Sequence, residues 1–113
     1  MKLPSTTIIA DEKITRYLLV QQERGDKSRF LRLAGYTLEI ADQLRQDLIE
    51  QLLPLDAIPL ESNEFGQNFE IVGELRGPNG RRLSVRTIWM TEHLSGITKF
   101  ITLIPITKTD HEP

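Results

Sequence analysis

Apolar residues in the first half of the chain recur three and four positions apart, which is typical of amphipathic helices. One helix is predicted to begin at Asp11 and to end near Arg24, with Ile14, Tyr17 and Leu18 on its buried face. A short second helix is predicted from residue 27 or 28 to residue 34. A third begins after Thr37 as its cap and ends before Pro54, with an apolar stripe formed by Leu38, Ala41, Leu44, Leu48 and Leu52.

After Pro54 the pattern changes to the period of two that indicates strands. Strands are predicted at residues 57–64, 69–76, 81–91 and 98–104, with an edge position for the first because it contains Pro59. A turn is expected at residues 65–68, and Gly77-Pro78-Asn79-Gly80 predicts a hairpin turn. The expected fold class is therefore α+β: two to three N-terminal helices packed on one face of a C-terminal, four-stranded antiparallel meander sheet.

Length and composition place this pattern in one domain covering residues 1–113, with a helical half at about 10–53, a sheet half at about 57–106 and a polar tail at 107–113. Such a chain is expected to fold alone or as a homodimer. The absence of cysteine excludes disulfides and thiolate metal sites and favours the cytoplasm. We expect no signal peptide and no membrane span, because no apolar run approaches the roughly 20 residues that a bilayer requires.

The common catalytic and cofactor motifs are absent from the sequence. We therefore expect no cofactor and no metal site, and we interpret residues 77–80 as a turn rather than a phosphate-binding loop. His93 lies in a predicted loop, where it is either a general acid or base or an ordinary solvated side chain. His111 falls in the predicted tail.

Basic residues are more informative, because they gather at two places despite a net charge of −2. The two groups are Arg24, Lys27, Arg29 and Arg32, and Arg76, Arg81, Arg82 and Arg86. They either form a phosphate-binding surface or solvate the surface while pairing with neighbouring acidic residues. Arg86 lies in mid-strand, where an arginine needs an exposed sheet face or a carboxylate partner. Trp89, on the opposite parity, is interpreted as a core anchor.

A series of short motifs carries a resemblance to a known family. The motifs are Ile14-Thr15-x-Tyr17-Leu18-Leu19, Arg24-Gly25-Asp26-Lys27-x-Arg29-Phe30, Ala34-Gly35-Tyr36, Gly73-x-Leu75-x-Gly77-Pro78-Asn79-Gly80-Arg81, Val85-Arg86-Thr87-Ile88-Trp89 and Thr102-x-x-Pro105. Their order resembles an uncharacterised bacterial domain family, found as short standalone proteins and as C-terminal domains of phage-head and polymorphic-toxin proteins. The resemblance covers most of residues 2–105.

In arrangement this family is similar to the barnase, EndoU, colicin and RelE group of ribonuclease toxins, which cleave RNA without a metal by using its 2′-hydroxyl as nucleophile. The resemblance implies an endoribonuclease-like toxin component with catalytic Lys27, Arg86 and Thr102. The predicted substrate contacts are Arg29, Arg81, Arg82 and Thr87. The implied partners are RNA and a cognate antitoxin.

The chain departs from this family at one point, and the ribonuclease hypothesis makes one geometric prediction. The family often has a His-Pro-x-Gly segment before the lysine, and residues 21–25 of this chain, Gln-Gln-Glu-Arg-Gly, lack that histidine. An active site would bring Lys27 and Arg86 within about 10 Å of each other in a positively charged groove. The alternative is a non-catalytic protein-interaction module, whose marker would be an apolar patch, such as exposed Ile88 and Met90, without a charged cleft.

Overall fold

Helices occupy the N-terminal half and strands the C-terminal half of the computed structural model, which describes residues 1–20 and 27–106. The helical elements are α1 (Asp11–Lys13), η1 (Ile14–Leu18), α2 (Ser28–Arg32), η2 (Leu38–Ile40), α3 (Ala41–Asp47) and η3 (Leu48–Leu52). The strands are β1 (Ile58–Ser62), β2 (Gly66–Arg76), β3 (Arg82–Glu92) and β4 (Thr98–Pro105). The predicted α+β class is confirmed, whereas residue 24 and the predicted tail lie outside the described residues.

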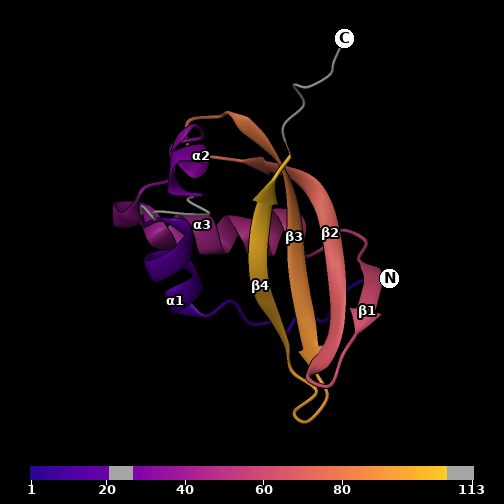
Figure 1. Ribbon diagram of the computed structural model, residues 1–113. Coiled ribbons are helices and arrows are strands. Elements are labelled where there is room, and N and C mark those ends of the chain that lie inside the picture. Colours follow the sequence, from indigo (N-terminus) through magenta and orange to yellow (C-terminus); the bar gives the residue numbers. More distant parts are fainter. Residues whose placement is uncertain (21–26, 107–113) are drawn as a thin grey trace.

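The four strands form one antiparallel sheet in the order β1-β2-β3-β4, so each strand pairs with its neighbour in sequence. Figure 1 shows the helices on one face of this sheet, with α3 crossing behind the strands, while no helix of the described residues covers the other face. The covered face holds the core because alternate side chains of each strand point towards the helices. Its fully buried members include Ile71, Leu75, Val85, Trp89 and Leu103. None of the helices in the described ranges is long and apolar enough to cross a membrane.

Trp89 anchors this core as predicted. Its indole ring is buried and lies edge-on to Phe100, with the ring centroids 5.2 Å apart. A bulge in β4 makes the contact possible: Ile88 pairs with Thr102, but the next residue, Trp89, pairs with Phe100, so Ile101 is the extra residue. The bulge also sets Phe100 and Leu103 on the same buried face although they are three residues apart.

The predicted third helix is present as three consecutive segments, η2, α3 and η3, between Leu38 and Leu52. Leu44, Leu48 and Leu52 are fully buried, as the stripe predicted, whereas Leu38, its first predicted member, is 50% exposed. Thr37 is the N-cap residue of η2, as predicted, with an extended backbone, but its side chain makes no capping hydrogen bond. The first helical stretch, α1 with η1, ends at Leu18 and is therefore shorter than predicted.

The Gly77–Gly80 turn joins β2 to β3 and also docks on the end of α2. The backbone N–H of Asn79 donates to the carbonyl of Ala34 (3.2 Å), and its side-chain amide donates to the carbonyl of Leu33 (3.1 Å). Gly77 has no room for a side chain, because a methyl group there would overlap the carbonyl oxygen of Ala34. Gly80 has a φ of +88°, which favours glycine. The turn therefore fixes the helical layer to one end of the sheet.

A buried polar network ties α3 to the same end of the sheet. The hydroxyl of Tyr36 donates to Oδ2 of Asp47 at 2.6 Å and lies 3.1 Å from the carbonyl oxygen of Arg76. The side-chain amide of Gln43 donates to the other carboxylate oxygen of Asp47 at 2.9 Å. Burial and the Asp47 carboxylate raise the pKa of Tyr36, because ionisation would leave two negative charges side by side.

The β1–β2 connection differs from the prediction. We expected a turn at residues 65–68, but β2 already begins at Gly66. Asn63 makes the turn instead, because its side-chain carbonyl accepts the backbone N–H groups of Phe65 (2.8 Å) and Gly66 (3.1 Å).

The opposite edge of the sheet is covered by the N-terminal segment. Ile8 pairs with β4 in parallel: its N–H donates to the carbonyl of Thr98, and its carbonyl accepts the N–H of Phe100, each at 2.9 Å.

Candidate functional site

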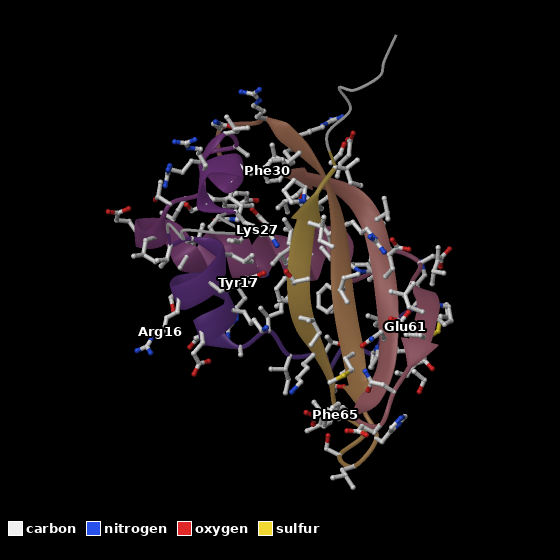
Figure 2. The ribbon with its side chains drawn as sticks, viewed as in Figure 1. Arg16, Tyr17, Lys27, Phe30, Glu61 and Phe65 are labelled. Carbon is white, nitrogen blue, oxygen red and sulfur yellow. The ribbon has the colours of Figure 1, made fainter. Side chains whose placement is uncertain are left out.

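Two predicted catalytic residues, Lys27 and Thr102, meet where the helical layer reaches the edge strand β4. Lys27 directly precedes α2, and its ammonium nitrogen lies 3.4 Å from Oγ1 of Thr102. Tyr17 of η1 completes the cluster: the Lys27 Nζ donates to the Tyr17 hydroxyl at 3.2 Å, and the two hydroxyls of Tyr17 and Thr102 are 2.9 Å apart. Figure 2 shows Tyr17 and Lys27 on the side of the helices that faces β4. We call these three residues the Lys27 cluster.

Each member of the cluster is held by a different element. Ile14 and Leu18, on either side of Tyr17 in η1, are buried in the core and direct the phenol towards β4. Thr102 follows the bulge residue Ile101 and pairs with Ile88 of β3. All three cluster residues are partly buried, so none of them is enclosed in the core.

The surroundings of Tyr17 favour its phenolate form. The hydrogen bond with Thr102 lowers the pKa of Tyr17 most, burial opposes this, and the hydrogen bond and positive charge of Lys27 and the charge of Lys13 lower it further. The ammonium groups of Lys13 and Lys27 lie 5.5 and 5.4 Å from the centre of the Tyr17 ring, within the range of cation–π attraction. The cluster therefore combines a phenol whose pKa is lowered with a positive charge in direct contact.

Arg86, the third predicted catalytic residue, lies beside the cluster but is already engaged. It pairs with Ile104, and Thr102 pairs with Ile88, so Arg86 and Thr102 are diagonal neighbours on the same face of the sheet. The Nε of Arg86 donates to Oε2 of Glu70 in an ion pair, and 40% of the arginine side chain is exposed. Both conditions expected for a mid-strand arginine, an open face and a carboxylate partner, are thus met.

The predicted substrate contacts have different environments. Arg29, Arg81 and Arg82 are exposed, and Arg82 forms a long ion pair with Glu74 at 3.9 Å. Because the Gly77–Gly80 turn docks on α2, Arg81 and Arg82 lie at the end of the sheet next to the helix that carries Arg29 (Figure 1). These three arginines could contact a ligand that extends from the Lys27 cluster towards this end.

Thr87 requires a correction. Its side chain is fully buried on the covered face, where its hydroxyl donates to the carbonyl of Ile71 (2.9 Å) and accepts the indole N–H of Trp89 (2.8 Å). It has no surface with which to touch a substrate, so we replace its predicted binding role with a structural one. The error arose because the motif around Arg86 included both faces of the strand, which alternate between core and solvent.

His93 lies at the other end of β3 from the Gly77–Gly80 turn. Its ring Nε2 is 3.0 Å from the carbonyl oxygen of Asn63, and its backbone N–H donates to the carbonyl of Phe65 at 3.0 Å. His93 therefore joins the β3–β4 connection to the β1–β2 connection. Within the described part of the chain, no group of three His, Cys, Asp or Glu side chains could hold a metal ion.

Tyr17 is the residue that sequence reasoning missed as a site member. We interpreted it as one of the apolar positions of the first helix, and its ring does pack against the core. The sequence offered no clear signal for Tyr17. Its π-helical segment, η1 (Ile14–Leu18), is of a kind that often occurs at functional sites, but such segments leave no clear mark in a sequence. Moreover, the second π-helical segment, Leu48–Leu52, contributes buried leucines rather than site residues.

The sequence matches the family described as domain of unknown function DUF6883 over residues 2–107. The same comparisons find no match among curated proteins and none among solved structures. The matched region includes every residue of the Lys27 cluster and the Gly77–Gly80 turn. The chain therefore belongs to the DUF6883 family.

Proposed function

We propose that the protein is a metal-independent endoribonuclease-like toxin component whose reaction takes place at the Lys27 cluster. One observation carries this proposal: the Lys27 ammonium contacts the hydroxyls of Tyr17 and Thr102. Lys27 and Thr102 in turn lower the pKa of Tyr17. Cleavage of RNA by its own 2′-hydroxyl needs a proton acceptor, a proton donor and a cation near the phosphate. The cluster contains side chains suited to all three tasks.

The proposed reaction balances with Tyr17 and Lys27 as proton carriers. The 2′-oxygen forms a bond to phosphorus while its proton passes to the Tyr17 phenolate. The bond from phosphorus to the 5′-oxygen breaks, and the Lys27 ammonium protonates that oxygen. The proton then returns from the Tyr17 hydroxyl to the Lys27 amine across their 3.2 Å contact. The products are a 2′,3′-cyclic phosphate and a free 5′-hydroxyl.

The remaining groups have supporting roles in this proposal. Thr102 holds the Tyr17 hydroxyl through their 2.9 Å hydrogen bond and thereby stabilises the phenolate. Arg86 is diagonal to Thr102 on the same face of the sheet, and its guanidinium N–H groups beyond Nε would bind a phosphate next to the reacting one. The Arg29, Arg81 and Arg82 side chains would contact the RNA backbone farther along.

The test is cleavage of a single-stranded RNA oligonucleotide by the purified full chain in EDTA. We expect cyclic-phosphate products, no cleavage of the all-deoxy oligonucleotide, and a rate that rises with pH until Tyr17 is ionised. Lys27→Ala and Tyr17→Phe should each lower the rate by about 100-fold or more.

Matched variants separate chemistry from folding. Lys2→Ala removes an exposed lysine whose ion pair among the described residues is with Asp56, and it should leave the rate unchanged. Circular dichroism should show that Tyr17→Phe is folded. An inactive wild type, or a Tyr17→Phe variant as active as the wild type, would refute the proposal. In bacteria, induced expression should arrest growth and degrade RNA with the wild type and not with Lys27→Ala.

A further inference from the structure

A hollow of about 180 Å³ lies at the end of the sheet that is distant from the Gly77–Gly80 turn. It is formed between the β1–β2 and β3–β4 connections and is lined by Glu64, Phe65, Glu92 and Leu94. Sites for small molecules usually measure about 300–1,000 Å³. The hollow is therefore of a size for one side chain of another molecule.

The apolar lining of the hollow is open to solvent. The Phe65 side chain is 66% exposed and Leu94 is fully exposed, and neither packs against the core. Isolated exposed apolar residues are common, but two of them lining one hollow form an apolar surface whose burial by a partner is favourable.

The rim of the hollow carries one negative charge without a partner. Glu92 accepts hydrogen bonds from Lys99 (2.6 Å) and Ser95 (2.8 Å), and these neighbours lower its pKa, so its charge is already matched. Glu64 is exposed and forms no ion pair with any residue in the described ranges. The complementary side chain therefore combines an apolar stem with a positive head, as arginine and lysine do.

Arginine fits the lining better than lysine. Its planar, weakly hydrated guanidinium can stack on the exposed Phe65 ring and still reach the Glu64 carboxylate, while its stem covers Leu94.

The loops around the hollow hold one shape before any partner binds. Asn63 fixes the backbone of Phe65, and His93 bonds to the carbonyl oxygens of both. Ser95 bridges Glu92 and the backbone N–H of Ile97. A surface held in this way loses little conformational entropy on binding.

We propose that this hollow docks a partner protein by accepting an arginine side chain flanked by apolar residues. The inference is independent of the proposed ribonuclease activity, because Lys27 contacts Thr102 farther along β4 while the hollow adjoins the start of that strand. The charge of the rim excludes an acidic segment, and the size of the hollow indicates an anchor within a wider contact, since stable interfaces bury about 1,200–2,000 Å².

A peptide titration of the ¹⁵N-labelled full chain, followed by NMR, tests this inference. The probes are three acetylated and amidated tripeptides: Leu-Arg-Leu, Leu-citrulline-Leu and Leu-Glu-Leu. We expect saturable shifts at the amides of Phe65, Gly66 and Leu94 with the arginine peptide, with an affinity about two- to five-fold above that of the neutral citrulline peptide.

Three variants complete the test. Glu64→Gln should abolish the preference for arginine over citrulline, and Phe65→Ala should weaken binding of both peptides. Glu61→Gln removes an exposed carboxylate that does not line the hollow and should change neither affinity. Shifts that are absent, equal for the arginine and glutamate peptides, or unaffected by Glu64→Gln would overturn the inference.

Discussion

Replacing Tyr36 by phenylalanine removes a single hydroxyl from the buried network between α3 and the end of β2. That hydroxyl donates to Asp47 at 2.6 Å, and Asp47 is only 7% exposed, so water cannot easily replace the lost donor. A hydrogen bond to a charged group contributes about 1.5–3 kcal/mol to stability. We therefore expect Tyr36→Phe to lower the free energy of unfolding by about 2–3 kcal/mol, or the melting temperature by roughly 8–12 °C in a chain of this size.

The second tyrosine provides a matched control. Tyr17→Phe also removes one hydroxyl, but from a partly exposed cluster of neutral and cationic partners, and it should cost about 0.5–1.5 kcal/mol. Urea unfolding at neutral pH, followed by the fluorescence of Trp89, measures both changes. If Tyr36→Phe costs no more than Tyr17→Phe, the network does not stabilise the fold as described.

The pH dependence gives an independent check on Tyr36. Its pKa is raised in the folded chain, so its contribution to stability is complete below the unfolded value of about 10 and declines as pH rises above it. Unfolding measured between neutral and strongly alkaline pH should show this decline in the wild type. A Tyr36→Phe protein that loses stability above pH 10 as steeply as the wild type would contradict the assignment.

Three further predictions concern other parts of the molecule. The chain has only two tyrosines, so an absorbance titration can follow both. Tyr17 should ionise reversibly below the usual tyrosine pKa, whereas Tyr36 should ionise only on unfolding. Tyr17→Phe should abolish the reversible step. Gly77→Ala should lower the free energy of unfolding by about 2–4 kcal/mol, because the added methyl group overpacks against Ala34 and the Asn79 contacts are lost. Urea unfolding measures this change, and a loss below about 1 kcal/mol would show that the turn can move away from Ala34. Glu70→Gln frees Arg86 and should tighten RNA binding by about two- to five-fold in a fluorescence anisotropy titration, whereas unchanged binding would exclude Arg86 from the RNA contact.

The sheet was predictable because its signals are local. Proline and Asn-Gly in residues 77–80 define a turn by their own backbone preferences, and the alternation on either side assigns faces to the strands. The leucine stripe in residues 38–52 predicts the buried helix in the same way. The Asn63 turn was missed because it depends on one side-chain carbonyl rather than on glycine or proline.

The site was only partly predictable because it depends on long-range contacts. Lys27 and Thr102 were predicted as site residues through a resemblance, and their direct contact could not be inferred from spacing. The bulge at Ile101 sets the pairing of Thr102, and nothing in the sequence of residues 98–104 indicates which one is extra. The error at Thr87 has a different cause, because the motif carried over by resemblance spans both faces of β3.

The hydrogen bond between Tyr17 and Thr102 closes a loop of 85 residues, whereas every strand pair in the sheet joins neighbours along the chain. Closing a longer loop costs more conformational entropy, so contacts of this kind tend to form after the local hairpins have paired. Side chains whose contacts form after the folding transition state influence the rate of unfolding more than the rate of folding. The Lys27 cluster is therefore expected to assemble late, and partly folded chains would hold the sheet without the site.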